Sequence, residues 1–242
     1  MNLHLYYCPG TCSFVPHAAL GLVEEATGQS YTSTLINLKN GEQQTPEYKA
    51  INPRSQVPAL LIDGKLLTQV IAIVSYLDSK FPKAQIFPTD PMERAQALST
   101  LAWMNNTVHT TFTRVFRPER FSADVASAKS MALEIFKSYL AEIDGMCQKN
   151  SPYICGSQLT PADIYAIAFI RWAGVAGAIT YPLFLIHGRV GLLTIQNLAN
   201  DSNKYFVYVA TLVVLMAVAY LLLKLEKKVL NLRPFRALSG RA

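Results

Sequence analysis

The order of strand and helix patterns over the first 81 residues constrains the fold of this chain most. Pro9-Gly10 ends a short aromatic run, Gly28 ends an amphipathic pattern, and Asp63-Gly64 is typical of a tight hairpin. The β-α-β-loop-β-β-α order predicts a small α/β domain with a mixed sheet. The strands are predicted at 2–7, 31–36, 57–62 and 65–67, and the helices at 13–26 and 68–81.

A helical region is expected after this domain. Residues 83–91 lie among several prolines and are typical of a linker, and residues 92–116 and 123–149 carry two long amphipathic patterns. Thr160-Pro161-Ala162-Asp163 predicts the start of a third helix, with Thr160 as the N-cap and Asp163 as its reciprocal capping partner.

Charge divides the chain into two parts. Residues 1–170 hold 13 Lys and Arg against 14 Asp and Glu, whereas residues 171–242 hold 9 against 2. The basic excess therefore belongs entirely to the last third. Because the balanced part shows no basic face with interleaved aromatic residues, we do not expect a nucleic-acid partner.

The last third contains two long uncharged runs. Residues 205–223 would span roughly 28 Å as a helix, close to the ~30 Å hydrocarbon core of a bilayer. Residues 172–186 form a shorter run, for which a buried core helix is an equal alternative. The Lys and Arg cluster after residue 223 is expected in the cytoplasm, so a two-helix hairpin would return the N-terminal domain to the same side.

The cysteines and the N-terminus agree with a cytoplasmic domain. Four cysteines are too few for a disulfide framework, and none belongs to a CxxC or metal-like cluster, so no metal is expected. The first residues lack the cationic and apolar regions of a signal peptide. We therefore expect the N-terminal part to stay in a reducing cytosol.

Cys12 lies directly before the helix that is predicted to start at Ser13. The free N–H groups and partial positive charge of a helix start stabilise a thiolate, and the Ser13 hydroxyl can donate a hydrogen bond to the same sulfur. The alternative is a small buried residue in a turn. Cys8 is expected to be a packing residue, although the spacing also permits a Cys8–Cys12 disulfide.

Val57-Pro58 comes directly before a predicted strand. A cis proline there would turn the preceding backbone outward and leave the Val57 N–H and C=O free to pair with a peptide-like ligand. The alternative is an ordinary trans proline at the first position of the strand.

Four ordered motifs carry a family resemblance: YYCPGTCSFVPHAAL, INPRSQVPALLIDGKLLTQVIAIVSYL, FRPER and YICGSQLTPADIYAIAFIRW. Over residues 1–172 the chain resembles a bacterial glutathione S-transferase, most like the beta class. The resemblance implies an α/β thioredoxin-like glutathione-binding domain at 1–82 and a truncated all-α domain at 90–172. It also implies glutathione as co-substrate, a small electrophilic substrate and a homodimer through residues 65–105.

The resemblance also assigns site residues. In that family a cysteine at the start of the first helix faces the glutathione sulfur, a position held here by Cys12 with Ser13 beside it. The other matches are the cis-proline Pro58, Val57 with its two main-chain hydrogen bonds to glutathione, Lys39 at a glutathione carboxylate, and His109 near the thiol.

The chain departs from the family pattern at two places. The third helix of the family usually starts with an acidic or amide residue followed by a small one. Here Gln69 keeps its hydrogen-bonding capacity, whereas Val70 offers only its backbone N–H. The separation of Trp103 and His109 is about one helical turn shorter than expected, so an ordinary helix-surface histidine is an equal alternative for His109.

The segment after Trp172 resembles a different family. AGAITYPLFLIHGRVGLL and residues 205–223 are similar to the last two membrane helices of an integral-membrane acyltransferase family. This resemblance implies an α-helical membrane hairpin at 173–225 and a basic cytoplasmic tail at 226–242. His187 and Arg189 match the pattern, but the family's earlier active residues are absent, so we expect no acyl transfer.

The sequence therefore predicts a glutathione transferase that conjugates glutathione to electrophiles or exchanges glutathione mixed disulfides through Cys12. Its C-terminal helices would anchor it to the inner membrane. Two alternatives stay open: a membrane-tethered glutathione-binding adaptor without turnover, and a gene-fusion product with a junction near Trp172 and impaired folding.

Overall fold

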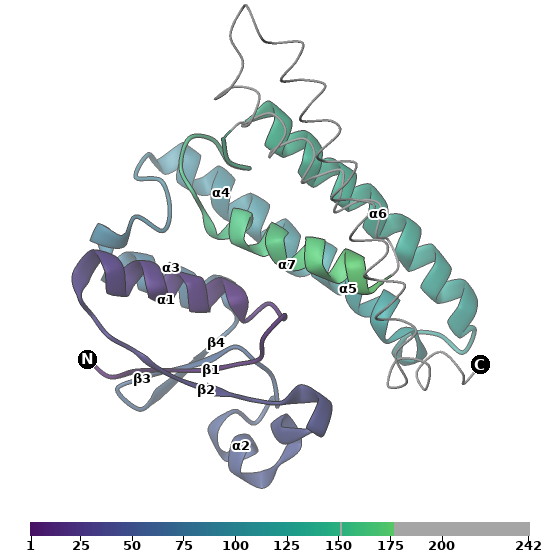
Figure 1. Ribbon diagram of the computed structural model, residues 1–242, viewed down its shortest axis with the longest axis horizontal. Coiled ribbons are helices and arrows are strands. Elements are labelled where there is room, and N and C mark those ends of the chain that lie inside the picture. The colour runs from purple at the N-terminus through teal and green to yellow at the C-terminus, as the bar shows by residue number, and fades with distance from the viewer. Residues whose placement is uncertain (151, 177–242) are drawn as a thin grey trace, which may run out of the picture. The chain divides into compact units, whose positions relative to one another are not determined.

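The computed structural model describes residues 1–150 and 152–176, which form an α/β domain followed by a helical domain (Figure 1). The predicted hairpin (173–225) lies almost entirely outside the described residues, and the basic tail (226–242), His187 and Arg189 lie wholly outside them. In the part of the chain that is described, no helix combines the length and apolar character needed to cross a bilayer.

A mixed four-stranded sheet forms the centre of the first domain, as predicted. Its strands β1 (Leu3–Tyr7), β2 (Thr32–Leu35), β3 (Ala59–Ile62) and β4 (Lys65–Thr68) have the order β2-β1-β3-β4. β1 pairs in parallel with β2 and antiparallel with β3, and β3 pairs antiparallel with β4. Asp63 and Gly64 both have positive φ, 47° and 82°, as a two-residue hairpin turn requires.

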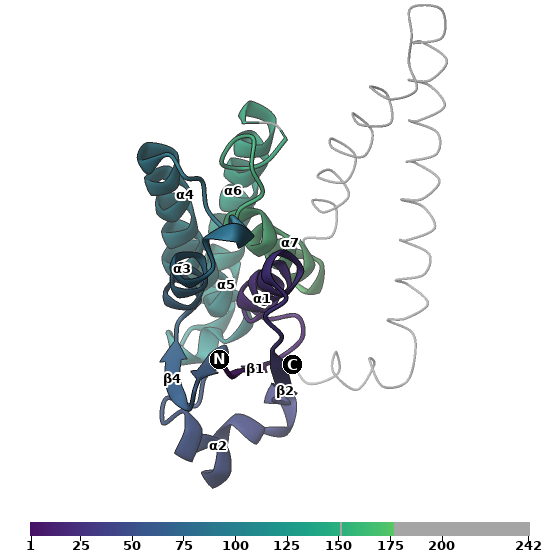
Figure 2. The same ribbon diagram turned by 90° about the vertical axis from the view of Figure 1, so that its left-hand side faces the viewer.

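Two helices cover one face of this sheet. Figure 2 shows α1 (Phe14–Thr27) and α3 (Val70–Lys80) side by side on that face, with the short α2 (Pro46–Ile51) on the opposite side. Alternation along β1 points Leu5 into the core, where it is buried with Leu20 of α1 and Ile73 of α3. α1 ends at Gly28, whose φ of 73° closes the helix as predicted.

The linker predicted over residues 83–91 is a packed connection. After the short turn η3 (Pro82–Ala84), the side chains of Ile86 and Phe87 are only 1% and 2% exposed. The Phe87 N–H donates to Asp78 Oδ1 at 3.0 Å, and the other carboxylate oxygen of Asp78 pairs with Arg94. Two apolar side chains and a carboxylate therefore hold the segment in place.

The second domain is helical. The helix predicted over 92–116 is α4 (Pro91–Trp103), a π-helical segment η4 (Met104–Val108) and α5 (His109–Phe116) in succession. The turn η5 (Pro118–Arg120) leads to the long α6 (Val125–Lys149) and then to α7 (Pro161–Val175). The predicted capping box of α7 is confirmed, because Thr160 and Asp163 satisfy each other's backbone.

Candidate active site

Cys12 lies in the tight turn between β1 and α1. The Thr11 N–H and hydroxyl both donate to the Cys8 carbonyl, at 3.4 and 2.8 Å, and α1 begins two residues after Cys12. The Cys12 Sγ lies 3.9 Å from the Val57 carbonyl oxygen, and the Val57–Pro58 peptide bond is cis as predicted. The structure therefore brings together Cys12, Val57 and Pro58.

The backbone at Val57 is held in place by the preceding loop. Tyr48 Oη and Asn52 Nδ2 both donate to the Gln56 carbonyl at 2.7 Å. β3 begins only at Ala59, and among the described residues no hydrogen bond from the Val57 N–H is found. This N–H is available to a peptide-like ligand beside the thiol.

The Ser13 hydroxyl makes its hydrogen bonds within the turn and not to the Cys12 sulfur, so the predicted hydrogen bond between them is wrong. Ser13 is fully buried, with its Oγ 2.9 Å from Thr11 Oγ1 and 3.5 Å from the donating Cys8 N–H. A short hydroxyl side chain in a tight turn takes the nearest backbone and side-chain partners. Ser13 therefore stabilises the turn that presents Cys12.

Burial dominates the electrostatics of the Cys12 thiol. Desolvation raises the pKa of the Cys12 thiol to about 11, against lowering by a backbone hydrogen bond and by Tyr165, and the neighbouring Cys8 raises it further. The predicted helix-stabilised thiolate is therefore wrong for this structure, because desolvation outweighs the helix start. At neutral pH the sulfur is a neutral thiol.

The helical domain brings two further polar side chains to this thiol. Tyr165 of α7 acts on this thiol by lowering its pKa, in opposition to desolvation. The Tyr165 hydroxyl lies 2.6 Å from His109 Nδ1 and 3.4 Å from Asn105 Oδ1. The His109 ring also packs on Trp172, with ring centroids 4.8 Å apart. His109 is therefore a half-buried histidine held between Tyr165 and Trp172.

The π-helical segment Met104–Val108 sets the direction of His109. The His109 N–H donates to the Met104 carbonyl, five residues back, instead of the α-helical four. A π turn changes the winding of the helix and so rotates the face that follows, and such turns are frequent at functional sites.

Burial fixes the protonation states of His109 and Tyr165. It lowers the pKa of His109 to about 4, so the imidazole is neutral at pH 7. Burial, together with the nearby Cys12, raises the pKa of the Tyr165 hydroxyl, which therefore keeps its proton. His109 and Tyr165 are therefore both uncharged at pH 7 and are hydrogen-bonded to each other.

The C-terminal part of α7 holds the turn that carries Cys12. Trp172 Nε1 donates to the Gly10 carbonyl at 2.7 Å. Gly10 has a φ of 74°, and a Cβ there would lie 3.2 Å from the Arg171 guanidinium carbon. Both the backbone conformation and the close approach of Arg171 therefore favour glycine.

The other predicted residues follow β2 and β4 at the same end of the sheet as Cys12, and none of the described contacts joins them to Cys12. Gln69 is exposed and has φ 74° and ψ 128° at the start of α3, a conformation that non-glycine residues rarely adopt. The Val70 side chain is 2% exposed in the core, so only its N–H faces the helix start. Lys39 is exposed in the turn η1 (Leu38–Asn40).

Sequence reasoning missed Tyr165, Asn105 and the bond from Trp172 to Gly10. One pattern could have indicated the first of these: Tyr165 and Trp172 are seven residues apart, so both lie on one face of the helix predicted from Pro161. No local sequence pattern predicts that Asn105 contacts the Tyr165 hydroxyl. Among residues 1–150 and 152–176, no cluster of three or more His, Cys, Asp or Glu could hold a metal ion.

Comparisons with known proteins agree with this geometry. Residues 1–79 match the model of the glutathione S-transferase N-terminal domain. Glutathione S-transferase GstA of Escherichia coli O157:H7 is 32% identical over 177 residues, which cover 71% of this chain and 82% of that protein.

Solved structures give the same result. A sphingomonad glutathione S-transferase complexed with glutathione is 25% identical, with a TM-score of 0.63, over 86% of this chain and 98% of that one. A beta-class glutathione S-transferase of Sphingomonas chungbukensis is 26% identical, with a TM-score of 0.61 and the same coverage. The chain belongs to the glutathione S-transferase family.

Proposed function

We propose that this protein is a glutathione transferase that binds glutathione against Val57 and holds the glutathione sulfur beside Cys12. The observation that carries the proposal is the Cys12 Sγ at 3.9 Å from the Val57 carbonyl, next to an N–H without a partner among the described residues. Glutathione is bound in the related sphingomonad structure. In our proposal Lys39 and Gln69, with the Val70 N–H, hold the ends of the tripeptide.

Two reactions fit this arrangement. In conjugation, the glutathione sulfur gives up its proton, attacks an electrophilic carbon and displaces the leaving group with its electron pair. In exchange, the Cys12 thiol first loses its proton to water, its sulfur attacks the glutathione sulfur of a mixed disulfide, the old S–S bond breaks, and the released thiolate takes up a proton from water. His109 acts near the thiol in both reactions.

The test combines binding with turnover on the full chain. We expect retention on immobilised glutathione, and activity with an aryl chloride or with a glutathione mixed disulfide. Cys12→Ala should lose disulfide exchange, because it removes the sulfur that lies 3.9 Å from the Val57 carbonyl oxygen, whereas Cys8→Ala should keep it. A folded chain that neither binds the resin nor turns over either substrate would refute the proposal.

The buried Val70 favours one alternative. Where the family has a small residue, this chain has a core side chain. We therefore expect weaker binding of the γ-glutamyl end, and the module could serve as an adaptor without turnover. Retention on the resin without any activity in wild-type protein would support the adaptor. Aggregation of residues 1–172 expressed alone would instead support the gene-fusion alternative.

The domain boundaries, the dimer and the membrane anchor are proposals from the sequence. We propose domains at 1–82 and 90–172, a homodimer through residues 65–105, and a membrane hairpin at 173–225 with the 226–242 tail in the cytoplasm. Alkaline washing of a membrane fraction tests the hairpin, since release of the chain into the wash would contradict it. Sedimentation of the purified chain tests the dimer.

A further inference from the structure

The peptide group between Gln56 and Val57 is held from one side. Its carbonyl accepts from Tyr48 Oη and from Asn52 Nδ2, both at 2.7 Å. Tyr48 belongs to α2, on the face of the sheet opposite α1 and α3 (Figure 2), and the two donor residues are 3% and 1% exposed. In the described part of the chain, the N–H of the same peptide group has no acceptor. The carbonyl end therefore has two buried partners, whereas the N–H end is open to a ligand.

Each of the two donors is fixed by a further contact. The Tyr48 ring packs edge-on against Tyr6 of β1, with ring centroids 5.7 Å apart. Asn52 Oδ1 accepts from the Arg54 N–H at 3.2 Å, which leaves its Nδ2 for the Gln56 carbonyl. Burial raises the pKa of Tyr48 to about 12, so its hydroxyl keeps the proton that it donates at neutral pH. Neither side chain can turn away from the carbonyl without losing its other contact.

Holding the carbonyl also sets the direction of the N–H. The Gln56–Val57 peptide is planar and trans, since the cis bond lies one residue later, at Val57–Pro58. In a trans peptide the C=O and N–H point in opposite directions, so the Val57 N–H points away from Tyr48 and Asn52. Hydrogen bonds at a carbonyl also polarise the peptide group and strengthen its N–H as a donor, by roughly 10–30% per bond. The two buried donors therefore both direct and strengthen the Val57 N–H.

We propose that Tyr48 and Asn52 are positioning residues for glutathione, which hold the Gln56 carbonyl so that the Val57 N–H is directed at the main chain of the tripeptide. The inference rests on the proposed function, in which glutathione lies against Val57. It goes beyond that function because it assigns part of the affinity to two side chains on the far side of the peptide group from the ligand. The Val57 carbonyl, 3.9 Å from Cys12 Sγ, connects the same backbone to the thiol.

Tyr48→Phe is the direct test, because it keeps the ring against Tyr6 and removes one of the two bonds to the Gln56 carbonyl. Isothermal titration of the full chain with S-methylglutathione measures the Kd. The Kd should rise roughly threefold to tenfold, as expected for loss of one neutral hydrogen bond. In turnover with an aryl chloride, the KM for glutathione should rise by a similar factor at unchanged kcat, because the bond from the Val57 N–H is made equally in the ground state and the transition state.

Tyr76→Phe is the matched control in the same domain. It removes from α3 a hydroxyl that donates to Met1 Sδ at 3.6 Å, far along the chain from Gln56. This variant should keep the wild-type Kd and KM. A purely structural role of Tyr48 would lower the free energy of unfolding and leave the Kd and KM of the folded chain unchanged.

The Val57 amide reports on these hydrogen bonds without any ligand. The chemical shift of an amide nitrogen responds to hydrogen bonding at the preceding carbonyl, because the two atoms belong to one polarised peptide group. In nuclear magnetic resonance spectra of the ligand-free full chain, the Val57 nitrogen resonance should move in Tyr48→Phe. It should stay in place in Tyr76→Phe.

A Tyr48→Phe chain that is folded by circular dichroism and keeps the wild-type Kd and KM would overturn the inference. So would a fall in kcat at unchanged KM, or an equal rise of the Kd in Tyr76→Phe. If Tyr48→Phe does not fold, Asn52→Ala is measured in the same way, and an unchanged Kd there would overturn it.

Failure of the proposed function has a different signature. A wild-type chain that does not bind S-methylglutathione would contradict the proposed function. The ligand-free spectra then decide the inference: an unmoved Val57 resonance in Tyr48→Phe would overturn it, whereas a moved one would keep the role of Tyr48 in directing the N–H.

Discussion

At the scale of single residues, the site is a set of groups held neutral by burial. The Cys12 thiol, with its pKa raised to about 11, and the His109 imidazole, with its pKa lowered to about 4, are both uncharged at pH 7. Charging any of them in a desolvated place costs free energy unless a partner is supplied. A sulfur anion at Cys12 therefore needs a partner that stabilises its charge.

The neutral His109 makes folding stability depend on pH. The pKa of His109 is about 4 in the folded chain and 6.5 in the unfolded one, so between these values the unfolded chain binds more protons. The free energy of unfolding should therefore fall as the pH is lowered from 6.5 toward 4. Urea denaturation at several pH values measures this slope.

His109→Asn, which cannot titrate, is the matched variant for this measurement, and its slope should be shallower than that of the wild type. Identical slopes would show that His109 is charged in the folded chain or is fully solvated.

Gln69 stores backbone strain at the start of α3. Its φ of 74° is unfavourable for a side chain and costs on the order of 1–3 kcal/mol. Gln69→Gly should raise the free energy of unfolding by about 1 kcal/mol and weaken retention on glutathione, because the amide is lost. Urea denaturation and resin retention measure the two effects.

Gln85→Gly is the control for this variant. Gln85 also has a positive φ, 46°, but lies in the connection between the domains, away from Cys12. It should gain stability without any change in glutathione retention. If Gln85→Gly also weakens retention on glutathione, the loss of retention in Gln69→Gly cannot be assigned to the Gln69 amide.

At the scale of secondary-structure elements, α7 does most to build the site, since it carries both Tyr165 and Trp172. Its start is fixed by Asp163, which accepts from the Ile154 N–H at 2.8 Å and from the Thr160 N–H and hydroxyl at 2.9 and 3.0 Å. Asp163 is also only 7% exposed. The helix start and the preceding loop therefore depend on one buried carboxylate.

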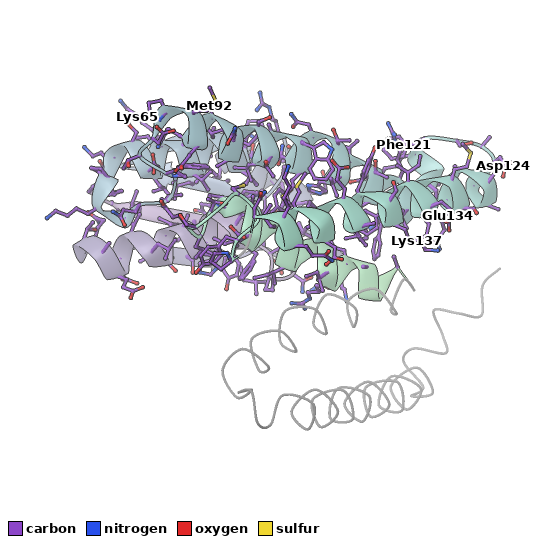
Figure 3. The ribbon with its side chains drawn as sticks, turned by 90° about the horizontal axis from the view of Figure 1, so that it is seen from above. Lys65, Met92, Phe121, Asp124, Glu134 and Lys137 are labelled. Carbon is purple, nitrogen blue, oxygen red and sulfur yellow. The ribbon has the colours of Figure 1, made fainter. Side chains whose placement is uncertain are left out.

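Asp163→Ala should lower the free energy of unfolding by roughly 2–4 kcal/mol, because it leaves buried donors without an acceptor. Asp124→Ala is the comparison, because Asp124 caps α6 at an exposed end and accepts from Ser127 alone, at 3.1 Å (Figure 3). That variant should cost about 1 kcal/mol. If urea denaturation shows that Asp163→Ala and Asp124→Ala lower the free energy of unfolding equally, burial of Asp163 does not increase its contribution to stability.

At the scale of the whole described molecule, the site exists because the helical domain is held against the α/β domain. Asp78 of α3 pairs with Arg94 of α4 and accepts from the Phe87 N–H between them. At the other end, Trp172 donates to Gly10. These contacts hold α4 against α3, and α7 against the turn that carries Cys12.

Arg94→Ala should lower the free energy of unfolding by about 2 kcal/mol, since it leaves the buried Asp78 carboxylate with one partner. Lys137→Ala breaks the Glu134–Lys137 pair on the outer face of α6, 2.8 Å long and exposed (Figure 3). It should cost less than about 0.5 kcal/mol. Urea denaturation compares the two variants. If Arg94→Ala lowers the free energy of unfolding as little as Lys137→Ala does, the Asp78–Arg94 pair does not stabilise the packing of the two domains.

Local sequence patterns were enough to predict most of the elements and several site positions, although α2 (Pro46–Ile51) lies in a stretch predicted as a loop. Gly28, the Asp63-Gly64 turn and the Thr160–Asp163 cap act within a few residues of themselves, so their types alone indicated where elements begin and end. The cis bond before Pro58 was one of two alternatives open at the sequence level, and the family resemblance favoured it. The packing of the linker at 83–91 could not be predicted, because the burial of Ile86 and Phe87 is a tertiary property.

The sequence by itself determined the order of strands and helices and the place of Cys12 before α1, because hydrophobic periodicity and turn residues act over short distances along the chain. Only the tertiary structure decided the state of the thiol and its partners. Desolvation of Cys12, the commitment of Ser13 to the turn and the contact of His109 with Tyr165 depend on how two domains pack. Burial and distance between remote residues are properties of that packing, and no local pattern encodes them.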